Sequence, residues 1–168
     1  MSDQPFTHLD AAGQARMVDV TAKEPTVRAA TASGVVRCSP EVVGLLRDGA
    51  VPKGDVLAVA RIAGIQAAKK TPELLPLAHV IGVHGVTVDL DITDTGVEIH
   101  ATVRTADRTG VEMEALTSVT VAALAAIDMV KGLDRFAHIE HVRRLAKEGG
   151  RSGRWIRHPE ATAPPPGR

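Results

Sequence analysis

The sequence predicts an α+β fold, with helices packed on one face of a mainly antiparallel sheet. Two runs of alternating apolar and polar residues, 86–92 and 97–103, flank a Gly-containing turn and predict a β-hairpin with one face in water. Two longer apolar stretches, 56–70 and 115–129, contain no proline and predict helices. The 168 residues show no repeat and no second domain.

The segment before the hairpin predicts one strand and two helices. Residues 26–37 are rich in Val, Thr and Ala and alternate weakly, which favours a strand. Ser39 and the proline after it signal the start of a short helix, and Gly49 signals its end. Asp55 can cap the next helix, 56–70, which is apolar on nearly every side. Such a helix is buried on more than one face, and in a short chain the second face indicates a subunit interface.

Gly64 lies in the middle of that second helix, where glycine costs about 1 kcal/mol relative to alanine. We therefore expect another element to approach closely there. The next segment, 71–80, is interrupted by prolines and is predicted to be an apolar loop that carries His79. A histidine in a loop is either simply packed or available to a ligand, and both interpretations stay open.

The helix predicted over 115–129 carries charge at both ends. Asp128 and Lys131, spaced i, i+3, share a face and can pair or converge on a ligand. Glu112 and Glu114 point to one side if the chain is extended there, and diverge if it is already helical. The charges either complement the helix dipole or form a site, in which a lysine beside carboxylates is suited to proton transfer.

Two basic features suit a phosphate-bearing ligand. Lys53 precedes a helix start, where free N–H groups favour an anion, although on this feature alone a solvated loop lysine is the more favoured interpretation. Lys147 begins a stretch of Gly, Ser and Arg, 147–154, in a basic segment that follows a predicted last strand, 136–145. That segment lacks the order of a P-loop, and a solvated basic tail would look the same.

The predicted order is therefore strand, helix, helix, strand, strand, helix, strand, which is typical of ferredoxin-like folds. We expect one domain over 1–158, with residues 1–13 as an arm that orders only against another segment. The Pro-rich tail, 159–168, is predicted to be disordered.

The composition excludes several classes of protein. The formal net charge is zero and only three residues are aromatic, which argues against nucleic-acid and membrane partners. The single cysteine, Cys38, excludes an internal disulfide and a multi-Cys zinc site. With no signal peptide and no apolar run that we judge long enough to span a membrane, we expect a soluble, cytoplasmic protein.

Short motifs follow one another in a specific order across 7–153. They are TH at 7–8, AG at 12–13, MVDV at 17–20 with Lys23, KGD at 53–55, ARIAGIQAAK at 60–69, PL at 76–77 with His79, TGVEMEALT at 109–117, DM at 128–129 with Lys131, and Lys147 with GGRSG at 149–153. In this order and spacing the chain resembles the MoaC family, the cyclic pyranopterin monophosphate synthases of molybdenum cofactor biosynthesis.

The resemblance implies a lyase with a ferredoxin-like fold. Members of the family convert a cyclised dihydroguanosine triphosphate, made from GTP by a radical enzyme, to cyclic pyranopterin monophosphate and pyrophosphate. It also implies a homohexamer, a trimer of dimers, with sites at subunit interfaces. The sequence requires no cofactor; its Glu and Asp residues permit Mg²⁺, but no motif demands a metal.

The resemblance assigns roles residue by residue. Asp128, Lys131 and Lys53 take the acid–base roles, and we expect Lys131 beside Asp128 to be a proton donor. The chemistry is consistent with this, since opening and reclosing a nitrogen-rich ring moves protons and displacing pyrophosphate needs cations. The expected substrate contacts are Leu77, Ala78, His79, Met113 and Glu114, with Glu112 nearby and Lys147 as a further cation.

One position departs from the family pattern. The family usually has Leu-Cys-His-Pro or Leu-Thr-His-Pro, whereas this chain has Leu77-Ala78-His79-Val80, and without the proline the loop is less rigid. The alternative function is therefore a catalytically weak or silent paralogue, an oligomeric module that binds a nucleotide or phosphate. A purely structural assembly protein is a third candidate. Neither would need to keep Asp128, Lys131 and Glu114 together.

Overall fold

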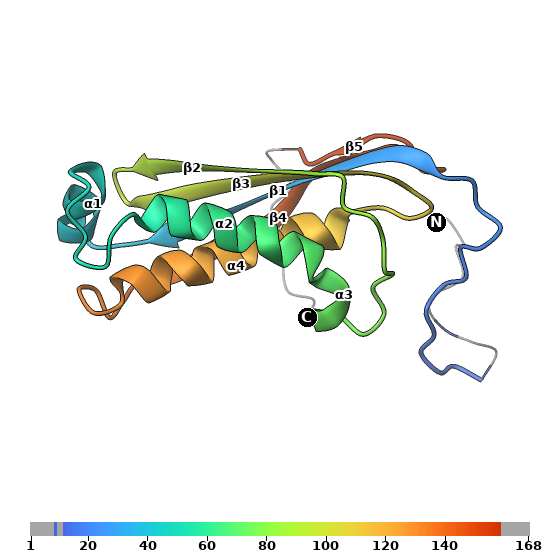
Figure 1. Ribbon diagram of the computed structural model, residues 1–168, viewed down its shortest axis with the longest axis horizontal. Coiled ribbons are helices and arrows are strands. Elements are labelled where there is room, and N and C mark those ends of the chain that lie inside the picture. The colour runs from blue at the N-terminus through green and yellow to red at the C-terminus, as the bar shows by residue number, and fades with distance from the viewer. Residues whose placement is uncertain (1–8, 10–11, 159–168) are drawn as a thin grey trace, which may run out of the picture.

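The computed structural model describes residue 9 and residues 12–158 (Figure 1). The motif at 7–8 and the predicted tail, 159–168, lie outside the described residues. The strands are β1 (Thr26–Arg37), β2 (Gly85–Thr93), β3 (Gly96–Asp107), β4 (His138–Glu148) and β5 (Trp155–Ile156), and the helices are α1 (Pro40–Arg47), α2 (Val56–Lys69), α3 (Thr71–Leu74) and α4 (Glu112–Val130).

The five strands form one sheet in the order β2-β3-β1-β4-β5, and every neighbouring pair is antiparallel. Because β3 lies between β1 and β2, those two strands run parallel to each other and are joined through α2. In the same way β3 and β4 flank β1 and are joined through α4. This split arrangement, with both helices on one face of the sheet, confirms the predicted ferredoxin-like α+β fold (Figure 1).

The core lies between the sheet and the two long helices. The hairpin alternates as predicted, and the four apolar residues of β3 that face the helices are fully buried. Alanines supply most of the helix side of the core, which lets α2 and α4 pack closely against each other. A Cβ at Gly64 would lie 3.0 Å from the backbone oxygen of Ser118 and 3.1 Å from Cβ of Ala122, so the predicted close approach is confirmed, and the approaching element is α4.

Both predicted helix caps are present. The N–H of Val42 donates to Oγ of Ser39 at 3.4 Å, at the start of α1. The N–H of Ala58 donates to Oδ1 of Asp55 at 2.9 Å, at the start of α2. Each cap satisfies one of the N–H groups that a helix start leaves without a backbone partner.

The structure differs from the sequence prediction at three places. Residues 71–74, predicted as loop, form the single turn α3, which the Thr71 hydroxyl stabilises by donating to carbonyl oxygens at the end of α2. The last long strand covers His138–Glu148 rather than 136–145, and irregular pairing with β1 explains its uneven pattern. The two-residue strand β5 is too short for any periodic signal.

The longest helix, α4, has 19 residues and is apolar enough, by length and composition alone, to cross a membrane. The sequence predicted no apolar run of that length; the helix reaches it because it continues into the charged residues on both sides of the apolar stretch, Glu112 and Glu114 at its start and Asp128 near its end. In the fold α4 packs along the sheet and buries residues such as Ala115, Val119 and Ala122 in the core. The core helix of a soluble protein passes the same test, so length and composition alone are weak evidence of a membrane span.

Candidate active site

Three of the predicted catalytic residues meet at the C-terminal end of α4. Nζ of Lys131 lies 2.6 Å from Oδ1 of Asp128, and Nζ of Lys53 lies 3.6 Å from Oδ2 of the same carboxylate. Lys53 also donates to the backbone oxygen of Asp128 at 2.7 Å. Lys53 comes from the loop before α2, far away in the chain. We call these three residues the lysine end.

The lysine end combines two cations with one carboxylate at the surface. All three side chains are about half exposed, so a ligand can reach them. The hydrogen bond from Lys131 and its charge, followed by the charge of Lys53, hold the pKa of Asp128 below its usual range. Asp128 is thus a stable anion, and the pair of lysines leaves this end with a net positive charge that suits phosphate oxygens.

The helix start near Lys53 is already capped by Asp55, whose carboxylate accepts from Ala58. The positive charge of Lys53 is turned toward Asp128 instead. A cation next to a helix start is unfavourable because of the helix dipole, and these two carboxylates offset that effect.

The predicted substrate contacts gather at the opposite end of α4. The loop after α3 carries Leu77, Ala78 and His79, and the first turn of α4 carries Glu112, Met113 and Glu114. We call this group the histidine end. A groove of about 640 Å³ lies here, lined by Ala15, Leu75, Pro76, Leu77, Ala78 and Met113.

Glu112 and Glu114 are both helical, so they diverge, as the second sequence interpretation predicted. Glu114 is only 3% exposed, whereas Met113 between them is 44% exposed. Burial raises the pKa of Glu114, its own backbone N–H opposes the rise, the Glu112 carboxylate adds to it, and His79 weakly opposes it. Glu114 therefore keeps a proton to higher pH than an ordinary glutamate.

One hydrogen bond holds the ring of His79, and a second holds the loop that follows it. Its Nε2 lies 2.6 Å from the carbonyl oxygen of Val18, in the segment before β1. Further along the loop, the N–H of Gly82 donates to Asp107 at 3.2 Å, at the end of β3. The contact with Val18 is a positioning interaction that no residue pattern in the sequence could predict, because 61 residues separate the two partners.

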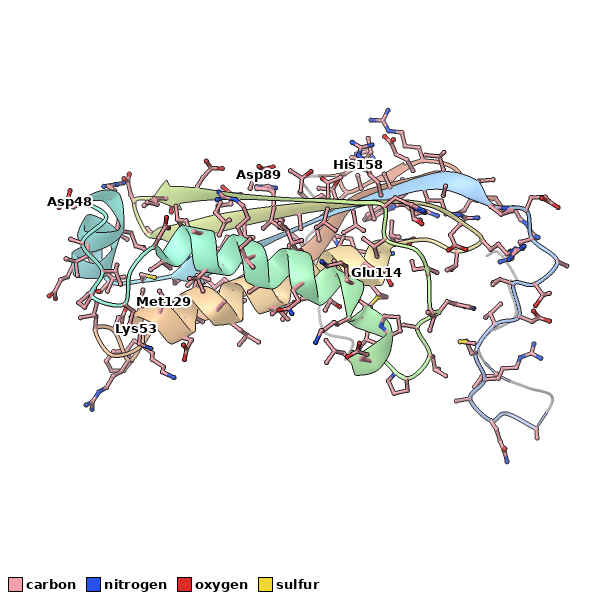
Figure 2. All side chains as sticks on the ribbon, in the orientation of Figure 1. Asp48, Lys53, Asp89, Glu114, Met129 and His158 are labelled. Carbon is pink, nitrogen blue, oxygen red and sulfur yellow. The ribbon has the colours of Figure 1, made fainter. Side chains whose placement is uncertain are left out.

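The two ends of the site are far apart within one chain. At about 1.5 Å per helical residue, α4 separates Glu114 from Asp128 by about 21 Å. Figure 2 shows Lys53 and Glu114 at opposite ends of the helical layer. The structure thus brings together the residues within each group, but not the two groups.

Lys147 belongs to neither group by contact. It lies on β4 opposite Ala30 of β1, and within the described part of the chain its Nζ contacts the hydroxyl of Ser152. The register places Lys147 near the strand ends where β3 finishes and the chain leads into α4. This is the side of the sheet nearer to the histidine end.

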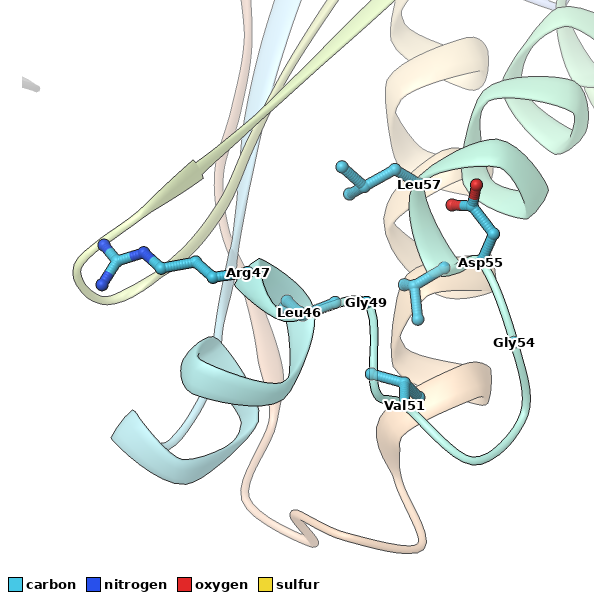
Figure 3. Close-up of a pocket in the computed structure, with 8 residues that line it drawn as sticks. Leu46, Arg47, Gly49, Val51, Gly54, Asp55 and Leu57 are labelled. Carbon is cyan, nitrogen blue, oxygen red and sulfur yellow. The ribbon is translucent and has the colours of Figure 1, made fainter.

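A separate hollow of about 360 Å³ lies between α1 and the start of α2 (Figure 3). It is lined by Leu46, Arg47, Gly49, Val51, Gly54, Asp55, Val56 and Leu57. Lys53 is not among the residues that line it, although its neighbour Gly54 is. This hollow is therefore not part of the predicted site.

Comparison with known proteins decides the family. The pattern of the MoaC family matches residues 17–150. This chain belongs to the MoaC family. It is 58% identical over 162 residues to a cyclic pyranopterin monophosphate synthase of Nocardioides, covering 94% of this chain and 99% of that protein.

Two further relatives give the same result. The chain is 61% identical over 152 residues to a cyclic pyranopterin monophosphate synthase of Streptomyces coelicolor, covering 90% of this chain and 89% of that protein. It is 54% identical over 152 residues to cyclic pyranopterin monophosphate synthase 2 of Mycobacterium tuberculosis strain H37Rv, covering 90% and 91%. The matched MoaC region includes both ends of α4, and therefore both residue groups described above.

Proposed function

We propose that this chain is a cyclic pyranopterin monophosphate synthase, a lyase of molybdenum cofactor biosynthesis. Its substrate is a cyclised dihydroguanosine triphosphate, and its products are cyclic pyranopterin monophosphate and pyrophosphate. The observation that carries the proposal is the lysine end, where Lys53, Asp128 and Lys131 converge in a chain of the MoaC family. A binding module would not need a carboxylate between two cations.

The lysine end supplies charge and a proton. A sugar hydroxyl attacks the inner phosphorus and loses its proton, a new P–O bond forms, and the P–O bond to pyrophosphate breaks. Lys53 and Lys131 would stabilise the charge that develops on the leaving group. Lys131, held by Asp128, would also donate a proton during ring opening and closure.

The histidine end supplies a partly apolar seat for the base. Leu77, Ala78 and Met113 line the groove, and such a surface suits a flat ring system. Buried Glu114, with its raised pKa, can hold a proton near the ring, and His79 can exchange one. Lys147 is proposed as an additional cation for the phosphates.

We propose that one complete site takes the lysine end from one subunit and the histidine end from another, because one α4 cannot bring them together. The outer face of the helical layer supports such an assembly. Ile62 is 65% exposed and Leu124 53% exposed, and large apolar residues clustered on a surface favour a protein interface. The expected assembly is a homohexamer built as a trimer of dimers.

The cellular setting follows from the substrate. A radical GTP cyclase would supply the cyclised nucleotide, and the cytoplasm is the proposed location. Among the described residues no group of three or more His, Cys, Asp or Glu side chains could hold a metal ion. If Mg²⁺ takes part, we propose that it arrives bound to the oxygens of the triphosphate.

The test is a coupled turnover assay. The purified protein is incubated with GTP and the radical cyclase, and cyclic pyranopterin monophosphate and pyrophosphate are measured. The proposal predicts both products in equal amounts. A folded, oligomeric protein that binds the cyclised nucleotide but forms no product would instead establish the binding-module alternative.

A further inference from the structure

The segment before β1 contacts the histidine end although it has no role in the reaction described above. Its carbonyl at Val18 lies 2.6 Å from Nε2 of His79. A carbonyl oxygen can only accept a hydrogen bond, so the hydrogen must be on Nε2. In the neutral ring Nδ1 then carries the lone pair, and it is the only ring atom that can accept a proton or a hydrogen bond.

The loop backbone is fixed on both sides of His79, by the N–H of Ala78 donating to the carbonyl oxygen of Leu75 and by Ile81 packing against the core, but His79 Nε2–Val18 is the hydrogen bond of the ring itself. The next residue, Val80, is 90% exposed and makes no packing contribution. Residue 80 is valine, so no proline ring fixes the backbone angle φ there. The orientation of the imidazole ring therefore depends largely on its hydrogen bond to the carbonyl oxygen of Val18.

The segment that carries Val18 is itself anchored. The N–H of Thr21 donates to Oδ1 of Asp19 at 2.8 Å, and the N–H of Lys23 donates to the carbonyl oxygen of Val20 at 3.0 Å, which closes a turn. Nε of Arg108 then donates to the carbonyl oxygen of Lys23 at 2.8 Å.

The anchor of this segment and the anchor of the His79 loop are neighbours in the chain. Arg108 holds the segment, and Asp107 beside it accepts from the N–H of Gly82 in the loop. The last residue of β3 and the first residue after it thus hold the segments that carry the two partners of the Val18–His79 hydrogen bond. The charged groups of α4 on this side are Glu112 and Glu114, and those of the segment are Asp19 and Lys23.

We propose that residues 17–23 form a positioning strap, anchored by Arg108, that holds His79 in the Nε2–H tautomer with Nδ1 turned to the substrate. The strap acts through His79 and is not itself catalytic. The role in turnover rests on the proposed function, but the tautomer does not, so the two can fail separately.

The first test is spectroscopic and needs no substrate. In the full-length protein with nitrogen-15 in its histidine rings, two-bond correlation spectra report which nitrogen carries the hydrogen. The His79 signal is assigned by its loss in His79→Gln. At alkaline pH we expect the Nε2–H form of the neutral ring. A predominant Nδ1–H form, or an average of both, would overturn the proposal.

The second test releases the strap. In Arg108→Ala we expect a mixture of His79 tautomers and, because misplacement of a reacting group is costly, a fall in kcat of about ten- to a hundredfold with little change in KM. Arg108→Lys, which can still donate to the Lys23 carbonyl, should recover most of both readouts. Arg47→Ala is the matched control, because Arg47 pairs with Asp94 and not with the strap.

The outcomes separate the two proposals. A shifted tautomer with unchanged turnover in Arg108→Ala would refute the positioning role and leave the synthase function standing. An Nε2–H tautomer in a wild-type protein without any turnover would support the strap geometry and refute the function on which its catalytic role rests.

Discussion

The charged residues at the C-terminal end of α4 act as a unit because Asp128 lies between two lysines. Spacing alone predicted the contact of Asp128 with Lys131, since residues i and i+3 share a helix face, and the structure confirms it at 2.6 Å. The contribution of Lys53 followed only from the family resemblance, because its partner is 75 residues away. Local spacing cannot encode such a contact; the packing of α2 on α4 creates it.

Replacing Lys131 by Ala tests the proton-donor role. General acid–base groups typically contribute about 10²- to 10⁴-fold, so we expect kcat to fall by at least about a hundredfold. Folding stability should hardly change, because the pair with Asp128 is exposed to solvent. Steady-state kinetics and thermal unfolding check the two halves of this prediction.

The matched control is Arg135→Ala, which removes an exposed cation four residues further along the same connector. It should keep wild-type kinetics. Equal turnover in Lys131→Ala and wild type would exclude Lys131 as the donor.

The raised pKa of Glu114 predicts that the free energy of unfolding depends on pH. Its pKa is raised in the folded protein, so from about pH 4.3 upward the folded chain holds a proton that the unfolded chain has released. The free energy of unfolding therefore falls as pH rises through that window. Glu114→Gln stays neutral, and its unfolding free energy should fall less steeply over the same range.

Urea unfolding at a series of pH values, for wild type and Glu114→Gln, measures the difference directly. Identical slopes would mean that burial does not perturb this carboxyl. The sequence could not show that Glu114 is buried and Glu112 is not, because it left open whether the chain is helical there.

The elements were largely predictable because their signals are local. Alternation located the hairpin, and Ser39 and Asp55 marked the helix starts at the observed positions. The turn α3 and the strand β5 were missed because segments of four and two residues are too short for either pattern to repeat. The irregular pairing of β4 depends on its partner β1, and this too lies outside any local signal.

The close contact between α2 and α4 predicts opposite effects for two helical glycines. In Gly64→Ala the new Cβ would meet the α4 backbone at 3.0 Å, and overpacking costs typically about 1–3 kcal/mol, which offsets the helix-propensity gain of about 1 kcal/mol. We expect the free energy of unfolding to fall by up to about 2 kcal/mol.

Gly44→Ala in α1 is the matched control, because nothing lies within 4 Å of its new Cβ. It should raise the free energy of unfolding by about 0.5–1 kcal/mol. Denaturant titration of both variants decides the matter, and a stabilised Gly64→Ala would show that the two helices are not tightly packed.

In the whole molecule, the residues that were predicted to form one site lie in two groups, the lysine end and the histidine end. Helix α4 contributes residues to both groups, and its length keeps the two groups about 21 Å apart. Residue patterns and family resemblance identified the members of both groups, and the length of α4 is the observation on which we base the proposal that a second copy completes the site (Figure 2).

The number of chains in the assembly can be measured without an activity assay. We expect light scattering to give a mass about six times the 17.7 kDa of the chain, as the proposed hexamer requires. Replacing Ile62, at the exposed outer face of α2, by Glu should dissociate the particle, because a charge would be buried at the interface. A monomeric wild-type protein would exclude a site shared between subunits.

The most direct test of a shared site is complementation between two inactive variants. Lys131→Ala and His79→Ala each damage one end, so a mixed dimer would contain one site with both ends intact and one site with both ends altered. In hexamers assembled at random from equal amounts of the two chains, half of the sites receive an intact lysine end and half of those an intact histidine end. Co-expressed with different tags and purified together, the two variants should therefore regain about one quarter of wild-type turnover in the coupled assay. Such recovery would establish that one synthase site is built from two chains. If both variants are inactive alone and the purified mixture is equally inactive, the shared-site account is contradicted.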